Sequence, residues 1–286
     1  MENSTLAKAR RGPRERRRGS VVALVLAGLT AGFSPTAAAS DASVAKLAYR
    51  AYYGGLSAVE IQATITVSNQ GYEVASVGHS IGFLDYLFPF QSRANGSGSF
   101  GNALESAEFS LESMYRGRSR QIRGLTKVNG APDWSVKPPI PLDERDPVPL
   151  RLRAESLDPV AAQVAAAVRQ SARETCGGTS RIFNGKVRTD IHLSHLGSET
   201  LVPTRFSDFS GPTEKCRARY ETLAGGYKKS WFGEDSPPPD IDFWITRLEG
   251  SNFWIPVRVE ADIKPVKVLV HLTSATVDAE NLIKSP

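Results

Sequence analysis

Alternation of apolar and polar residues is the dominant pattern along this chain. In residues 59–67 every second side chain is apolar and those between are polar or charged, the period of a strand with one buried face. Asn69-Gln70-Gly71, and asparagine–glycine pairs at 129–130 and 184–185, are typical of tight hairpin turns. Comparable apolar stretches predict further strands at residues 46–53, 72–77, 241–248, 254–263 and 267–277. The pattern therefore predicts consecutive strands that pair antiparallel.

One predicted helix interrupts these strands. Asp158 has the side chain of a good N-cap, and Pro159 stands at the first helical position, where a missing N–H costs nothing. The alanine-rich helix is predicted over residues 159–171. A parallel doubly wound fold would need a helix after nearly every strand, so the pattern favours a mainly β protein. We expect a single antiparallel domain over residues 40–286, with a curved sheet that forms an open or half-closed barrel.

The first 39 residues have the order of a secretory signal peptide. Seven basic side chains within residues 8–18 precede an uncharged apolar run over 21–33, and Ala37-Ala38-Ala39 offers a small-residue cleavage site. The apolar run has about 13 residues, fewer than the roughly 20 that cross a bilayer as a helix. We expect cleavage after Ala39 and export to the periplasm, by general secretion or, through Arg16-Arg17-Arg18, by the twin-arginine route.

The charge balance changes once residues 1–39 are set apart. The whole chain holds 35 basic and 30 acidic residues, a net charge of +5 that suits a nucleic-acid binder. Seven of the basic and two of the acidic residues lie within residues 1–39, so the remaining chain has no net charge. A run of four arginines within residues 116–123 is then expected on a solvated face. We expect a soluble exported protein without a nucleic-acid partner or a transmembrane segment.

Cys176 and Cys216 are the only cysteines, and both belong to the part expected to be exported. An even number of cysteines in an oxidising compartment favours a disulfide, whereas two free buried thiols are the alternative. We predict a structural disulfide between these two residues.

Gly78-His79-Ser80-Ile81-Gly82 matches the G-x-S-x-G motif of α/β hydrolases, in which the serine is the nucleophile. Asp262 and His271 follow in the chain order of triad partners, but both lie on predicted strands. The motif also comes before the strands that a hydrolase sheet needs ahead of it. We therefore expect no enzymatic activity and no catalytic residue, with a serine hydrolase using Ser80 as the less favoured alternative.

Two further motifs carry little weight. Residues 96–101 match G-x-G-x-x-G, which binds dinucleotides when a strand precedes and a helix follows, but they also suit a glycine–serine turn between strands. His192 and His195 are three residues apart, so a strand places them on opposite faces, which is unsuitable for one shared metal. We expect neither a cofactor nor a metal.

Residues 81–90 form an apolar stretch with a single charge, Asp85. Such a segment either lines or covers a ligand cavity, or fills one end of the sheet as part of the core. On the first interpretation, the side chains that face an apolar ligand are Phe83, Leu84, Leu87 and Phe88.

Three stretches of this chain carry a resemblance to a known family. The first is residues 47–56, LAYRAYYGGL, with the alternating strand after them. The second joins Leu157-Asp158-Pro159 to Cys176-Gly177-Gly178, and the third joins residues 182–188, IFNGKVR, to Ser210-Gly211-Pro212 and the five residues from Cys216 to Tyr220. Together they resemble the domain of unknown function 3108 family of bacterial exported proteins, with Asn184 where an aspartate is expected.

The resemblance implies an exported β protein without an established activity. The family is similar in plan to periplasmic half-barrel proteins that hold lipid or lipoprotein acyl chains. We therefore expect a non-enzymatic cell-envelope protein that binds an apolar ligand, such as a lipid, or a protein partner in the concavity of its curved sheet. A structural or interaction module of the envelope without a ligand cavity is the alternative.

Overall fold

The computed structural model describes residues 42–100, 104–127, 132–173, 175–228, 239–247, 254–263, 265–277 and 280–283. The expected signal peptide and the predicted turn at residues 129–130 lie outside the described residues. Within them the chain forms one antiparallel sheet of fourteen strands with three short helices. The prediction of a mainly β protein built on an antiparallel sheet is confirmed. The prediction of a single helix is wrong, because two further short helices are present.

The elements follow one another in two groups along the chain. The first group comprises β1 (Ser43–Tyr53), β2 (Leu56–Val67), β3 (Gly71–Ser80), α2 (Gly82–Leu87), β4 (Phe90–Phe100), β5 (Leu104–Tyr115), β6 (Arg118–Lys127) and β7 (Asp133–Lys137). The second comprises α3 (Leu150–Ala154), α4 (Pro159–Arg173), β8 (Gly178–Phe183), β9 (Arg188–Leu201), β10 (Gly211–Ala224), β11 (Ile241–Arg247), β12 (Trp254–Ile263), β13 (Val266–Val277) and β14 (Glu280–Ile283).

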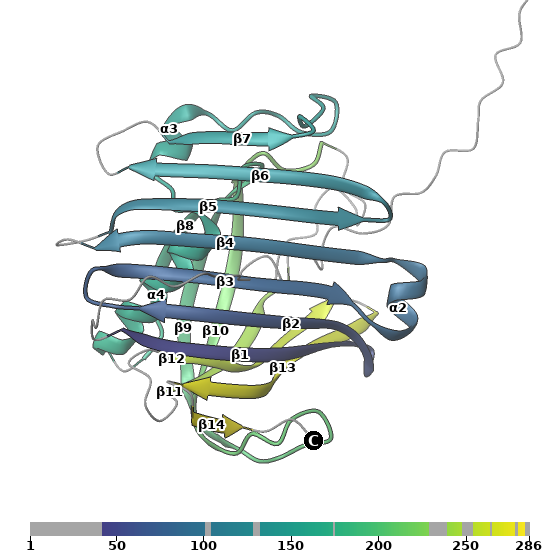
Figure 1. The fold of residues 1–286 in the computed structure, drawn as a ribbon, viewed down its shortest axis with the longest axis vertical. Helices are drawn as coiled ribbons and strands as arrows, with labels where there is room; N and C mark the ends of the chain where they lie inside the picture. The colour runs from purple at the N-terminus through teal and green to yellow at the C-terminus, as the bar shows by residue number, and fades with distance from the viewer. Residues whose placement is uncertain are drawn as a thin grey trace, which may run out of the picture.

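The sheet joins the two groups through the first long strand and the last. Its strand order is β7-β6-β5-β4-β3-β2-β1-β13-β12-β11-β10-β9-β8, and β14 pairs with β13 outside this path. Strands β1 to β7 form the front layer of Figure 1, with β8, β9 and β10 behind it. Ala45 of β1 pairs with Val277 of β13, and Tyr49 pairs with Leu272. The sheet is not closed, because β7 and β8 are its two end strands.

Side chains bring these two ends together. The rings of Trp134 on β7 and Phe183 on β8 meet edge to face, with 4.9 Å between their centroids. Gly185, in the β8–β9 turn, has a φ of +82°, and a Cβ added there would lie 2.6 Å from the side chain of Ile122 on β6. A glycine at this turn therefore permits both the backbone conformation and the close approach. The sheet is thus half-closed as expected: its end strands β7 and β8 do not pair through their backbones, but their side chains pack together.

Helix α4 lies between the two halves of the sheet. It contacts β4 and β5 on one side and β8 and β12 on the other, and Figure 1 shows it behind the front layer. Val160, Ala161 and Val164 are buried against a cluster that includes Tyr72 and Phe109. A second cluster fills the space lined by β1, β2, β12 and β13. The concave face is thus occupied by α4 and by core side chains.

Asp158 caps α4 as the sequence predicts. Its Oδ1 accepts hydrogen bonds from the N–H groups of Val160 and Ala161, at 2.8 and 2.9 Å. The residue is 1% exposed, and its Oδ2 has no hydrogen-bond partner among the described residues. Burial raises the pKa of this carboxyl to about 6, although the two backbone N–H groups act in the opposite direction. The cap is therefore an acid whose charged form the fold disfavours.

Gly96 belongs to a strand and not to a turn. The interpretation of residues 96–101 as a glycine–serine turn is wrong for residues 96–100, which lie in β4 and pair with β3 and β5. No helix follows them, because the next described element is β5, so the dinucleotide motif lacks its structural context. A Cβ added to Gly96 would lie 2.5 Å from Val160 of α4. The glycine allows the helix to lie directly on the strand.

We predict that Gly96→Ala lowers the free energy of unfolding by about 2 kcal/mol, because the added methyl group forces α4 away from β4. Urea unfolding measures the change. Val160→Ala added to Gly96→Ala should recover part of the loss. Gly177→Ala is the control, since an added Cβ there meets nothing within 4 Å. Equal losses from Gly96→Ala and Gly177→Ala would contradict this packing.

Helices α2 and α3 were not predicted because they are too short to show a helical pattern in the sequence. They have six and five residues, fewer than two helical turns, so neither shows a helical period in the sequence. Helix α3 begins directly after Pro149, and Arg188 of β9 donates from Nε to the carbonyl oxygen of Leu152 at 3.2 Å. The apolar stretch at residues 81–90 contains α2, which connects β3 to β4.

Candidate functional site

A polar trough on the outer face of strands β3 to β7 is the candidate site. It is a hollow of about 660 Å³ on the side of the front layer that faces away from α4. The outward side chains that line it belong to Glu73, Ala75, Asn95, Ser97, Glu108, Ser110, Gln121, Arg123, Leu125, Asp133, Ser135 and Lys137.

Strand alternation explains why these side chains gather there. Val74 and Phe109 point into the core, so their neighbours Glu73 and Glu108 point outward. Antiparallel pairing then aligns the outward residues in rows across the sheet. One row runs through Glu73, Ser97, Glu108, Leu125 and Asp133, and the next through Ala75, Asn95, Ser110, Arg123 and Ser135.

The charges of the trough are separated by row. The first row carries three carboxylates, the second carries Arg123, and the following row ends at Lys137, which pairs with Gln121. Successive rows lie about 7 Å apart along the strands. The lining charges are therefore carboxylates at one end of the trough and Arg123 and Lys137 at the other, where Glu112 lies beside Gln121, an arrangement that complements a ligand with both signs of charge.

These charges have no partners within the part of the chain that the structure describes. No ion pair there joins Glu73, Glu108 or Asp133 to Arg123 or Lys137, whereas Arg217 on β10 holds Asp242 on β11 at 2.6 Å. The trough's lining side chains bond instead to one another or to a neighbour: Asn95 donates to the hydroxyl of Ser110 at 3.3 Å, and Gln121 donates to the Glu112 carboxylate at 3.4 Å. The trough can therefore offer free donors and acceptors to a bound molecule.

The four side chains expected to face an apolar ligand do not lie together around a cavity. Leu84 alone turns inward, where it lines an apolar hollow of about 40 Å³ together with Ala51, Val59 and other core residues. That volume is about the share of one water molecule in the liquid. Phe83 and Leu87 are exposed, Phe88 is half-buried, and α2 has no buried residue.

Ser80 forms structural hydrogen bonds. Its hydroxyl donates to the Asp85 carboxylate at 2.7 Å and accepts from the N–H of Phe90 at 2.8 Å, so it joins β3, α2 and the start of β4. The side chain of His271 is buried on β13, where its ring stacks on Phe206 at 5.8 Å. Ser80 and His271, two of the three residues named as a possible triad, are therefore engaged in other contacts.

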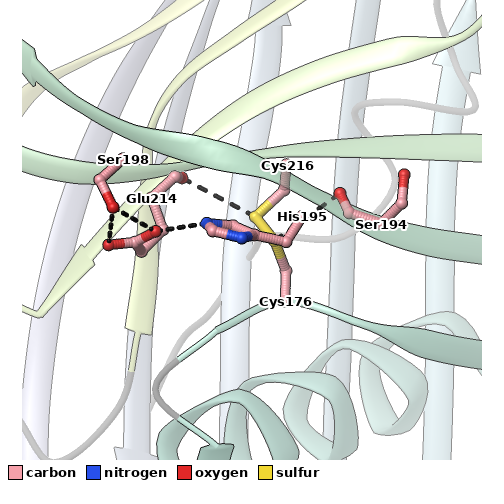
Figure 2. The surroundings of a disulfide bond; sticks show 6 residues. All are labelled: Cys176, Ser194, His195, Ser198, Glu214 and Cys216. Carbon is pink, nitrogen blue, oxygen red and sulfur yellow. Dashed lines mark hydrogen bonds and ion pairs between the residues drawn. A yellow bond between two sulfur atoms is a disulfide. The ribbon is translucent and has the colours of Figure 1, made fainter.

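The two cysteines lie where the predicted disulfide requires them. Cys176 follows α4 and Cys216 lies on β10; their Cα atoms are 6.2 Å apart and their sulfur atoms are at bonding distance. Figure 2 shows the bridge beside His195, whose Nε2 pairs with the Glu214 carboxylate at 2.5 Å. Ile245 packs against both cysteines. The bridge holds the segment after α4 against the sheet.

His192 and His195 do not form a shared site. His192 pairs with Glu221 and His195 with Glu214, so the two histidines act separately. Within the described ranges, no three metal-ligating side chains gather in one place. None of the described helices is long and apolar enough to cross a membrane.

Sequence reasoning did not single out the trough. Of its outward lining residues, Arg123 was considered as part of a run on a solvated face, and Ser97 as part of the glycine motif at residues 96–101. The available signal was the outward polar positions of β3 to β7. Their alignment depends on a strand register that the sequence does not specify.

The fold and the trough define a class, an open antiparallel β-sheet curled around one helix with a polar hollow on its outer face. The chain belongs to the DUF3108 family of proteins of unknown function, whose model matches residues 48–268. Among solved structures it is similar to the β-barrel-like protein of domain of unknown function DUF1849 from Brucella abortus. That similarity has 12% identity and a TM-score of 0.48, covering 84% of this chain and 98% of that one. No curated protein matches the chain.

Proposed function

We propose that this protein is an exported, non-enzymatic protein of the cell envelope that binds an extended segment of a partner polypeptide in its polar trough. The single observation that carries the proposal is a hollow of about 660 Å³ across five strands, whose charges of both signs have no ion-pair partner among the described residues. A polypeptide segment presents backbone donors and acceptors together with side chains of either charge, and so complements such a surface.

The position of the trough also favours an extended segment. The trough reaches β7, an end strand that pairs only with β6 in the described sheet. An end strand offers unpaired backbone N–H and C=O groups, to which another chain can add as a strand. A segment added to β7 would place alternate side chains over the trough.

An apolar ligand in the concavity has less support. The concave face is filled by α4 and the core clusters, and the apolar hollow beside Leu84 holds about 40 Å³. A lipid acyl chain needs far more apolar volume than this hollow offers. The structure therefore favours the protein partner over the apolar ligand.

Two features of the chain support export, its N-terminal residue pattern and its cysteine pair. The basic, apolar and small-residue order of residues 8–39 is that of a cleaved signal peptide. The cysteine pair at disulfide distance suits an oxidising compartment such as the periplasm.

A photoreactive residue in the trough tests the proposal. With benzoylphenylalanine in place of Ser110, irradiation of cells should join the protein to a defined partner polypeptide. Arg123→Glu together with Glu108→Lys should reduce that product about tenfold, the equivalent of about 1.4 kcal/mol of binding, because both ends of the trough then repel the same segment. The intact mass of the protein should be that of a chain beginning at Ser40.

Benzoylphenylalanine in place of Ser119 is the matched control, since this exposed serine lies on the same sheet outside the trough. Equal cross-linking from both positions, or a product unaffected by the charge reversals, would contradict a partner site in the trough.

A further inference from the structure

One end of the front layer carries a cluster of exposed apolar side chains, the apolar tip. It comprises helix α2, the β1–β2 turn and the β5–β6 turn, which Figure 1 shows at the same end of the layer. Tyr86 is 85% exposed, Phe83 64% and Leu56 63%, and Tyr53, Leu87 and Met114 are also exposed. Large exposed apolar groups in one cluster mark an interaction surface, whereas scattered ones do not.

Helix α2 is fixed to the sheet so that its apolar side faces outward. The inward anchors are Leu84, which packs against the core, and Asp85, which accepts a hydrogen bond from Ser80. The N–H of Ile81 donates to the carbonyl of Ala58 at 2.9 Å, which holds the helix beside β2. Phe83, Tyr86 and Leu87 have the spacing that places three side chains on one side of a helix, and all three are exposed.

An arginine in a strained backbone conformation lies beside this helix. Arg116 and Gly117 form the two-residue β5–β6 turn, with φ values of +50° and +76°. Turns of this kind prefer asparagine followed by glycine, and a left-handed arginine costs about 1 kcal/mol. Arg116 is the one non-glycine residue with a positive φ among the described residues. Its N–H donates to the carbonyl of Pro89, directly after α2, at 2.9 Å.

Further basic groups surround the apolar tip. Arg118 is exposed at the start of β6, and Arg205 reaches to within 4 Å of the Cβ position of Gly55 in the β1–β2 turn. The acidic residue of α2, Asp85, is held by Ser80. Among the described residues of this tip, three arginines, Arg116, Arg118 and Arg205, therefore outnumber the one carboxylate of α2.

We propose that the apolar tip docks on an anionic lipid surface. Phe83, Tyr86 and Leu87 enter the boundary between headgroups and acyl chains, and Arg116 and Arg118 contact lipid phosphates. Aromatic and aliphatic side chains beside basic ones are the composition that binds this boundary. A strained arginine at a position where asparagine is preferred agrees with a need for charge at this turn.

Tryptophan fluorescence tests the docking at the level of single residues. Tyr86→Trp places a reporter on the tip, and Leu150→Trp places one on α3, a similarly short helix whose Leu150 is 72% exposed. The probes are vesicles of phosphatidylcholine with brominated acyl chains, with or without phosphatidylglycerol. Vesicles containing phosphatidylglycerol should quench the tryptophan at position 86 beyond the signal of the four native tryptophans, and leave the one at position 150 unchanged.

Arg116→Asn separates docking from folding. On the Tyr86→Trp background it should weaken the docking equilibrium about fivefold, the value of one basic residue near an anionic surface. It should also raise Tm by about 2 °C, because asparagine suits the turn. If Arg116→Asn binds the vesicles more weakly and is also more stable than the parent, misfolding cannot be the cause of the weaker binding.

Three results would overturn the proposal. The first is equal quenching at positions 86 and 150, and the second is quenching that does not need phosphatidylglycerol. The third is self-association that Tyr86→Ser abolishes, measured by light scattering, which would assign the tip to a second copy of the chain.

Discussion

Loss of the disulfide between Cys176 and Cys216 should lower the free energy of unfolding by about 4 kcal/mol. The two cysteines are 40 residues apart, and closing a loop of that length restricts the unfolded chain by about this amount in the chain-entropy model. Urea unfolding of the oxidised and reduced protein measures the difference.

Cys176→Ala with Cys216→Ala supplies the matched control for reduction. The double variant should unfold close to the reduced protein, and a reductant should leave its transition unchanged. The same urea midpoint for the oxidised and reduced protein would show that the bridge adds nothing to stability.

Asp158→Asn should raise the free energy of unfolding at pH 8 by about 3 kcal/mol and leave it unchanged near pH 4. Burial raises the pKa of the Asp158 carboxyl from the ordinary 3.8 to about 6, a shift worth about 3 kcal/mol. The folded state therefore binds this proton more tightly than the unfolded state. The stability that the protonated carboxyl contributes is complete below pH 4 and is lost as the pH rises through 6.

The substitution preserves the cap and removes the charge. An asparagine side-chain oxygen can still accept from the N–H groups of Val160 and Ala161, and asparagine is as good an N-cap as aspartate. Asp158→Ala removes the cap, so it should lose about 1 kcal/mol at pH 4, where the charge plays no part. Stability curves of Asp158→Asn and the parent that stay parallel from pH 4 to pH 8 would contradict this assignment.

His271 titrates in the opposite direction and must be separated from Asp158. Burial lowers the pKa of its imidazole to about 4, and the nearby Arg258 acts in the same direction. The folded state disfavours the imidazolium, so this residue reduces stability as the pH falls below 6.5. Because His271 is present in both the parent and the Asp158 variants, the difference between them isolates Asp158.

The local patterns predicted only part of the fold, six of its fourteen described strands and helix α4. Period-two alternation placed β2, and the Asp158-Pro159 pair placed the start of α4, because strand alternation and helix capping each depend on a few neighbouring residues. The cysteine pair also lies as expected, since two cysteines permit only one pairing.

Contacts between distant residues account for what the sequence did not reveal. Gly96 was assigned to a turn because glycine and serine favour turns. It lies instead in strand β4, at the point where α4 approaches the strand closely. Residues 81–90 were expected to meet a ligand or the core, but the anchors at Leu84 and Ser80 turn α2 outward. The rows of the trough arise only from the register of five strands.

The pairing of β1 with β13 also sets a condition on the order of synthesis. The ribosome completes β1 first, yet one side of that strand finds its partner only when residues 266–277 have been added. Until then the N-terminal meander has an open edge at β1, and open edges pair with strands of other molecules. Ladders between such distant segments also form slowly. A growing chain therefore remains open to its neighbours through β1 until residues 266–277 have been added.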